Sequence, residues 1–176
     1  EARVVMDETA PIEAREAAIE ANRLSPDLIP AAAMAARSFL LKGDKRSAAR
    51  VLKKSGEVSP HPDRAAAFAE IEPEETPDRR LKRFRDLASV NPSHEETRLL
   101  MTELHIAAED FPGARRALGD LATTHPTARS LALMAAVEKG EGSDDSVVRG
   151  WLARAMTAPR GPQWCCDKCQ AIHSSW

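Results

Sequence analysis

The 176-residue sequence has few aromatic side chains, few cysteines and no strong excess of either charge. Four phenylalanines and three tryptophans are its large aromatic residues, so much of the 43% hydrophobic content is alanine. Alanine-rich faces suit close packing of helix against helix. The net charge of −2, from 25 basic and 27 acidic residues, gives no electrostatic case for binding nucleic acid.

Several sequence patterns are also missing. No apolar run reaches the ~18 residues that a membrane-spanning helix needs. We find no glycine-rich phosphate loop, no zinc-protease motif and no nucleophile elbow. No window before residue 160 alternates apolar and polar residues as a strand does. These absences favour an all-α protein that is not an enzyme.

Five prolines recur with a nearly constant period. Their spacings are 34, 32, 34 and 33 residues, for Pro26, Pro60, Pro92, Pro126 and Pro159. A period in the low thirties is typical of stacked helical hairpins, and 34 is the length of a tetratricopeptide (TPR) repeat. The chain therefore resembles a TPR array, which implies a superhelical solenoid of antiparallel helix pairs.

The repeat also appears inside the period. An acidic turn followed by alanine and then leucine occurs twice, 66 residues apart. These positions are Asp44, Ala48 and Leu52 in one copy and Asp110, Ala114 and Leu118 in the other. A small residue lets two helices approach, and a large residue one turn later fills the core beside them.

Apolar spacing and proline or glycine positions predict nine helices beyond the first eight residues, which resemble a helix end. The third repeat has Glu70 and Pro73 where small and aromatic residues are expected, so its first helix should be short. The predicted helices are 11–24, Ile29–Leu41, Lys45–Lys54, Arg64–Ile71, Thr76–Val90, Glu95–Glu109, Pro112–Thr123, Ala128–Lys139 and Asp144–Met156.

Two sets of polar side chains have plain structural interpretations. The basic cluster Arg79, Arg80, Lys82, Arg83 and Arg85 is interspersed with aspartates, which favours a solvated helix face over a binding patch. The histidines at 61, 94, 105 and 125 are dispersed, and we interpret them as structural or solvated.

All three cysteines lie within five residues near the carboxyl end, after a proline- and glycine-containing linker. Cys166 and Cys169 form a Cys-x-x-Cys pair, the spacing at which two thiolates bind one tetrahedral ion. We predict residues 1–158 to be the helical array and 159–176 to be a linker with an incomplete zinc-ribbon or rubredoxin-like tail. A second cysteine pair does not follow, so zinc or iron binding is expected in the intact protein rather than in this chain.

Other interpretations of these thiols remain open. Free or oxidised cysteines in a tail are one, and His173 as a third metal ligand is another. A thioredoxin-like redox pair lacks its βαβ context, and covalent haem attachment needs histidine where Gln170 stands. Cys165 is interpreted as a bystander rather than a ligand or nucleophile.

The tail residues carry a more specific resemblance. Pro162, Trp164, the Cys166–Cys169 pair, His173 and Trp176 follow helical repeats. This order resembles the carboxy-terminal part of alphaproteobacterial HemY-type TPR proteins, which are membrane-anchored and associated with haem biosynthesis. The resemblance implies a soluble piece of a bacterial inner-membrane protein, with the anchor upstream. The three clustered thiols fit a reducing compartment better than an oxidising one, so we expect this region on the cytoplasmic side. A TPR and rubredoxin-like regulator of lipopolysaccharide assembly is the alternative kinship.

The expected function is a scaffold that holds a peptide or helix of a protein partner in the TPR groove. The resemblance implies an enzyme of late haem synthesis as that partner. Projection of the repeat register places six residues on the groove face: Arg37, Leu41, Arg64, Leu99, Glu103 and Leu133. The alternative function is a metal- or haem-responsive module using Cys166 and Cys169. A dimer through an exposed end hairpin is a further expectation.

Overall fold

The computed structural model describes residues 12–161, 164–165 and 172–173. Within this part of the chain it contains ten helices and two short strands, and the all-α prediction is confirmed. The chain divides into two compact units, one up to Thr97 and one from Arg98 onwards. None of the described helices has the length and apolar character needed to cross a membrane.

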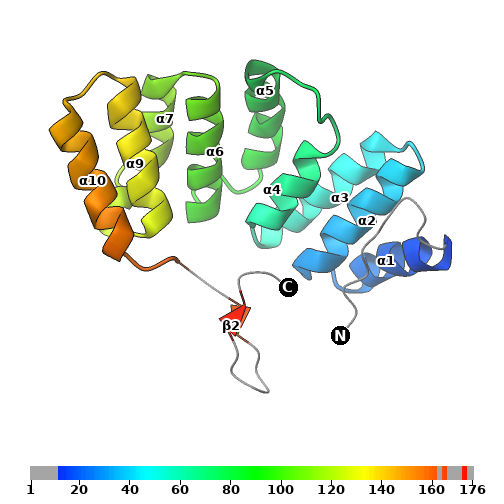
Figure 1. Ribbon diagram of the computed structural model, residues 1–176. Helices are drawn as coiled ribbons and strands as arrows, with labels where there is room; N and C mark the ends of the chain where they lie inside the picture. The colour runs from blue at the N-terminus through cyan, green and yellow to red at the C-terminus, as the bar shows by residue number, and fades with distance from the viewer. Residues whose placement is uncertain (1–11, 162–163, 166–171, 174–176) are drawn as a thin grey trace. The chain divides into compact units, whose positions relative to one another are not determined.

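The first unit is built from helices packed side by side (Figure 1). Its helices are α1 (Ile12–Leu24), α2 (Ile29–Leu41), α3 (Lys45–Val58), α4 (Pro62–Ala69) and α5 (Pro77–Ala88). Helix α2 contacts α1, α3 and α4. Its alanines make this possible, because Ala32, Ala35 and Ala36 are fully buried and let three helices approach one backbone.

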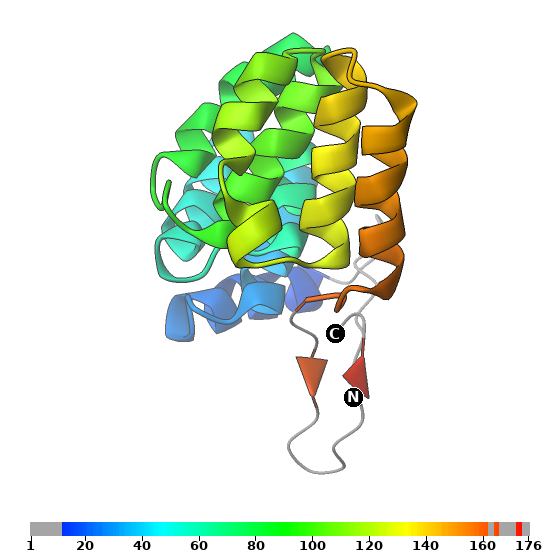
Figure 2. The ribbon, with the colours of Figure 1, turned by 90° about the vertical axis from the view of Figure 1, so that its left-hand side faces the viewer.

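The second unit holds the remaining helices, and α6 begins three residues before its boundary. They are α6 (Glu95–Ala107), α7 (Phe111–Leu118), α8 (Leu121–Thr124), α9 (Ala128–Gly140) and α10 (Asp145–Thr157). Helices α9 and α10 lie side by side, yellow and orange in Figure 2. Strands β1 (Trp164–Cys165) and β2 (Ile172–His173) pair antiparallel, with Trp164 opposite His173.

Three helix pairs are joined by the same tight turn. At the end of α2 the N–H of Gly43 bonds to the carbonyl of Leu40, and that of Asp44 bonds to Phe39. Equivalent pairs of bonds close α6 at Glu109 and Asp110 and close α9 at Gly142 and Ser143. The residue at the turn has a positive φ in each case: 76° at Gly43, 55° at Glu109 and 83° at Gly142. This is the Schellman geometry that ends many helices.

The five periodic prolines all stand outside the helices: four lie in segments between helices, and Pro159 follows the end of α10. The predicted bounds of α2 are confirmed, and the short first helix of the third repeat is confirmed by the eight residues of α4. The predicted helix Pro112–Thr123 was wrong as a single element. Gly119, with φ of 54°, ends α7, and a short α8 follows.

Candidate interaction site

The six residues predicted for the groove divide into two groups. Arg37, Leu41, Glu103 and Leu133 are partly exposed, on α2, α6 and α9. The other two, Arg64 and Leu99, are 2% and 4% exposed. A partner cannot reach buried side chains, so their place on a binding face needs correction.

Arg64 holds together three segments of the first unit. From α4, its guanidinium donates to the carbonyls of Ser55 and Ser59 at the end of α3 and to that of Asp27, at 3.1 Å. The Ser55 hydroxyl in turn donates to the carbonyl of Pro26 at 3.0 Å. Burial lowers the pKa of Arg64 to about 10, so the side chain remains charged at neutral pH. Its role is to neutralise the carbonyl end of α3.

Leu99 belongs to the core of the second unit. This cluster consists of Leu99, Leu118, Leu121, Ala122, Leu131 and Met134. Leu133 packs against the edge of the same cluster together with Trp151. Leu99 therefore lies on α6, the first helix of its pair, as predicted, but its side chain faces the core and not a binding face.

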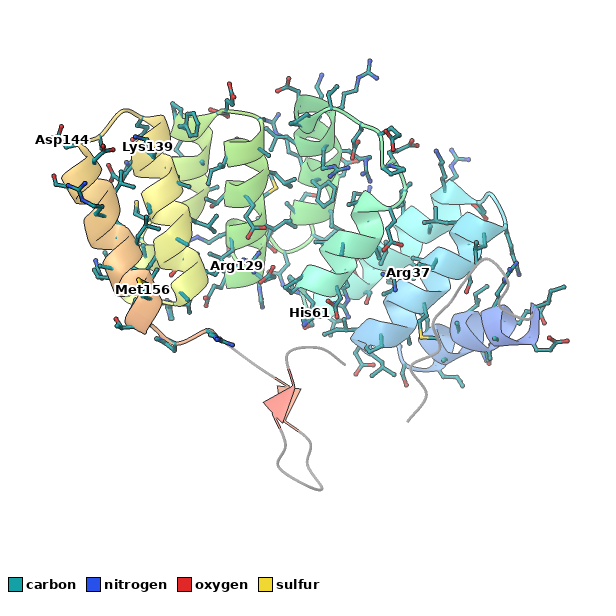
Figure 3. The ribbon with its side chains drawn as sticks, viewed as in Figure 1. Arg37, His61, Arg129, Lys139, Asp144 and Met156 are labelled. Carbon is teal, nitrogen blue, oxygen red and sulfur yellow. The ribbon has the colours of Figure 1, made fainter. Side chains whose placement is uncertain are left out.

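Ion pairs occupy two of the partly exposed positions. Arg37, labelled on α2 in Figure 3, binds Glu70 through both carboxylate oxygens, at 2.8 and 2.9 Å. This pair joins α2 to the residue that ends α4. Arg129 of α9 donates to Glu103 of α6 at 2.7 Å. The Glu70 bond raises the pKa of Arg37. Such pairs add about 0–1 kcal/mol each, so they orient these helices more than they stabilise them.

Two arginines of the basic cluster on α5 make contacts within the first unit. Arg80 and Arg83 both bind the carboxylate of Glu75. Arg83 also lies over the ring of Phe68, 4.6 Å from its centre, and donates to the Phe68 carbonyl. Phe68 and Phe84 meet edge to face at 4.9 Å. Of these two arginines, Arg83 covers the aromatic core of the first unit, and Arg80 is tied to the same carboxylate beside it.

His61, His94 and His105 each form a hydrogen bond near a helix end, whereas the sequence predicted only that the histidines are structural or solvated. His61 and His94 each accept the N–H of the residue two positions later, at 3.1 Å, near the starts of α4 and α6. Burial lowers the pKa of His61. His105 lies 2.8 Å from the carboxylate of Asp110, the N-cap of α7.

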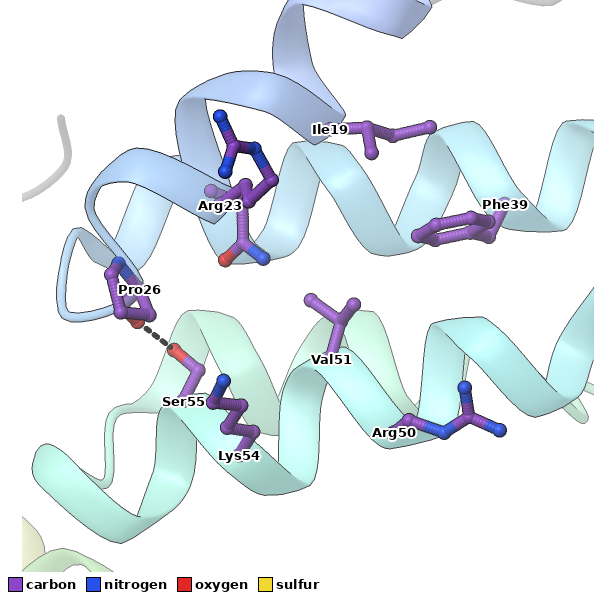
Figure 4. Close-up of a pocket in the computed structure, with 9 residues that line it drawn as sticks. Ile19, Arg23, Pro26, Phe39, Arg50, Val51, Lys54 and Ser55 are labelled. Atoms are coloured by element: carbon purple, nitrogen blue, oxygen red, sulfur yellow. Dashed lines mark hydrogen bonds between the residues drawn. The ribbon is translucent and has the colours of Figure 1, made fainter.

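A pocket of about 250 Å³ opens among α1, α2 and α3, and sequence analysis did not identify it. Its apolar lining comes from all three helices and from the α1–α2 connection. Figure 4 shows Ile19, Phe39 and Val51 facing the space from α1, α2 and α3 respectively. Pro26 closes one end, where its carbonyl accepts the Ser55 hydroxyl.

The charged residues of this lining are all basic. They are Arg23, Arg50 and Lys54. Arg23 is held by Glu20 of the same helix at 2.7 Å. Arg50 contributes to the lowered pKa of Asp44, behind the bonds from Ser47, and forms no ion pair within the described part of the chain. Arg50 and Lys54 stand one helical turn apart, a spacing visible in the sequence without revealing what lies between them.

The cysteine pair predicted to bind metal, Cys166 and Cys169, lies outside the described residues. The strands on either side of it are paired, with Cys165 opposite Ile172. Two thiolates supply half of a tetrahedral zinc site. Among the residues that the structure describes, no group of three or more histidine, cysteine, aspartate or glutamate residues is placed to hold a metal ion.

Comparison with known proteins gives one partial relationship. No family model matches the chain, and no solved structure was found to match it. The chain is similar to the probable magnetosome protein Mms48 of Magnetospirillum gryphiswaldense, with 29% identity over 161 residues. The alignment covers 89% of this chain but 35% of the relative, so the chain spans about a third of that protein's length.

Proposed function

We propose that this protein is a non-enzymatic scaffold that binds a segment of another protein on its helical hairpins. The observation that carries the proposal is the repeated helix pair, closed three times by the same turn, with partly exposed charged and leucine side chains on the first helices. Arrays of this kind bind extended or helical segments on the surface of successive helices. The four exposed groove candidates, Arg37, Leu41, Glu103 and Leu133, are the proposed contacts.

Two settings for the partner are proposed, each from a different observation. The resemblance of residues 162–176 to HemY-type proteins supports an enzyme of late haem synthesis at the bacterial inner membrane. The similarity to the probable magnetosome protein Mms48 supports a partner associated with the magnetosome instead. The metal-responsive alternative rests on Cys166 and Cys169, and zinc or iron analysis of the reduced protein tests it beside a C166S/C169S variant.

Site-specific photocrosslinking in the native host tests the scaffold. A benzophenone side chain at Leu41 or Leu133 should crosslink one protein, whose identity distinguishes the two settings. The same group at Glu57, exposed on α3, is the control position. Equal crosslinking from Glu57, or none from the two leucines, would contradict the proposal.

A charge swap separates partner contact from internal structure. In the variant R37E/E70R the ion pair between α2 and the end of α4 is retained, because the two charges exchange places. The fold should therefore keep its unfolding midpoint. Crosslinking from Leu41 should fall if Arg37 contacts the partner, and an unchanged yield would assign Arg37 to internal packing alone.

A further inference from the structure

We propose that the pocket among α1, α2 and α3 receives one large apolar side chain from an acidic segment of a partner protein. The inference rests on the proposed role in protein binding and adds a second surface to it. None of the six groove candidates lines this pocket.

The size of the pocket indicates what it holds. At about 250 Å³ it falls below the about 300–1,000 Å³ that is typical of small-molecule sites. The strongest contacts of a protein interface are commonly single aromatic side chains that fill such well-packed pockets. Ile19, Phe39 and Val51 offer such a side chain an apolar wall on three helices.

The arrangement of the helices explains why the space is present. Helix α2 packs against both α1 and α3, while α1 and α3 make little contact with each other. Their facing sides are partly exposed at Ile19 and Val51. An inserted side chain would remove this apolar surface from water, which favours binding.

The charge of the pocket lining favours acidic residues on either side of the partner's apolar side chain. Three cations and no carboxylate line the pocket, and Arg50 and Lys54 form no ion pair within the described residues. Acidic residues on either side of that side chain would meet these cations, which favours encounter and sets the orientation of the segment. A basic or neutral segment would leave Arg50 and Lys54 without a counter-charge.

A polar group in the wall favours a peptide over a hydrocarbon chain. The side-chain oxygen of Asn22 is buried and accepts no hydrogen bond from the described residues. Buried acceptors are normally satisfied. A peptide backbone carries N–H donors past every side chain, whereas a fatty-acyl chain carries none.

Fluorescence anisotropy with three synthetic peptides tests the proposal on the whole chain. The probe is a fluorescein-labelled nonapeptide with a central phenylalanine between glutamates. One comparison peptide has alanine at the centre, and the other has lysines in place of the glutamates. We expect the first peptide to bind, and both comparison peptides to bind about tenfold more weakly or worse.

Protein variants locate the binding. V51F should fill the pocket and V51I should leave room, so only V51F should weaken the phenylalanine–glutamate peptide, by about tenfold. R50Q/K54Q should weaken it by a similar factor and reduce its salt dependence. K42Q/R46Q is the control, because it removes the same charge from exposed residues that do not line the pocket.

Three outcomes would overturn the inference: no binding of the first peptide, equal binding in V51F, or equal losses in the two double variants. Binding of phosphatidylglycerol vesicles without binding of the peptide would assign the basic residues to a membrane surface and overturn it too. If the peptides fail while Leu41 and Leu133 still crosslink a partner, only this inference is wrong and the scaffold proposal stands.

Discussion

At the scale of single residues, Arg64 shows how burial changes the meaning of a charge. Projection of the repeat register onto the sequence placed it on a binding face. The structure makes it 2% exposed and surrounds its guanidinium with backbone carbonyls of Asp27, Ser55 and Ser59. A buried cation with such partners fixes the connections between helices, and its loss removes charge-assisted hydrogen bonds from these carbonyls.

Substitution of Arg64 by alanine should lower the free energy of unfolding by about 3 kcal/mol. R64K should lose less, since an ammonium retains the charge and three donors. Urea unfolding followed by circular dichroism at 222 nm measures both. R46A, on the exposed face of α3, should change stability by less than about 0.5 kcal/mol. A loss for R64A no larger than that of R46A would show that the buried contacts contribute little.

The pH dependence of the Arg64 contribution follows from its pKa. Burial lowers the folded-state pKa of Arg64 to about 10, well below the ordinary value of an arginine side chain. Only above about pH 10 does the unfolded state bind more protons at this group, so stability from this group rises with pH there. Between about pH 5 and 9 the difference in stability between the wild type and R64A should stay constant.

At the scale of helices, the backbone geometry of the turn repeats even where the residue at the turn changes. Gly43 and Glu109 occupy the same place in the turns before α3 and α7, and the aspartate after each caps the next helix. Glycine adopts positive φ without steric cost, whereas a glutamate at φ of 55° brings its Cβ close to a carbonyl oxygen. The second copy of the turn is therefore strained at Glu109.

Replacement of Glu109 by glycine should raise the free energy of unfolding by about 1 kcal/mol through relief of this strain. E109A is the matched control: it removes the exposed carboxylate and keeps the strained φ, so no gain is expected. G43A should lose stability by a similar amount in the other copy of the turn. Thermal unfolding midpoints of the three variants measure the effect, and equal gains for E109G and E109A would point to the carboxylate instead.

The helix caps give the protein a predictable response to acid. The N–H of Gly113, and then His105, lower the pKa of Asp110 below 3.8. A depressed carboxyl pKa contributes stability that is present above the unfolded-state value and is lost as pH falls through the folded-state value. D110N keeps an oxygen to cap α7 but does not titrate. Its urea midpoint should therefore fall less than that of the wild type below about pH 4, and parallel curves would contradict this.

At the scale of the whole molecule, the chain consists of two units, and each has its own core. Phe84 is 2% exposed and packs on Phe68 in the first unit, while Leu131 is 1% exposed within the cluster of the second. Each core is formed by helices close in sequence, as expected for repeats that contact only their neighbours. Local opening of one unit should thus leave the other protected.

Hydrogen exchange read by mass spectrometry tests this division. F84A should remove about 3–5 kcal/mol of protection from α3 to α5, and L131A about 2–5 kcal/mol from α7 to α9. Each variant should leave amide protection in the opposite unit within error of the wild type. Loss of protection throughout the chain from either substitution would mean that the two units unfold as one.

The sequence by itself determined the helical class, the period near 33 residues and most helix positions, including all of α2. These depend on local rules: proline ends or begins helices, and small and large apolar residues recur at helical spacing. Only the tertiary structure decided which side chains are buried and where one predicted helix is interrupted. Arg64 and Leu99 face inward because neighbouring helices cover them, and Gly119 breaks a helix that apolar spacing had extended. The pocket likewise exists because α1 and α3 pack on α2 and not on each other, and no single segment of sequence contains that information.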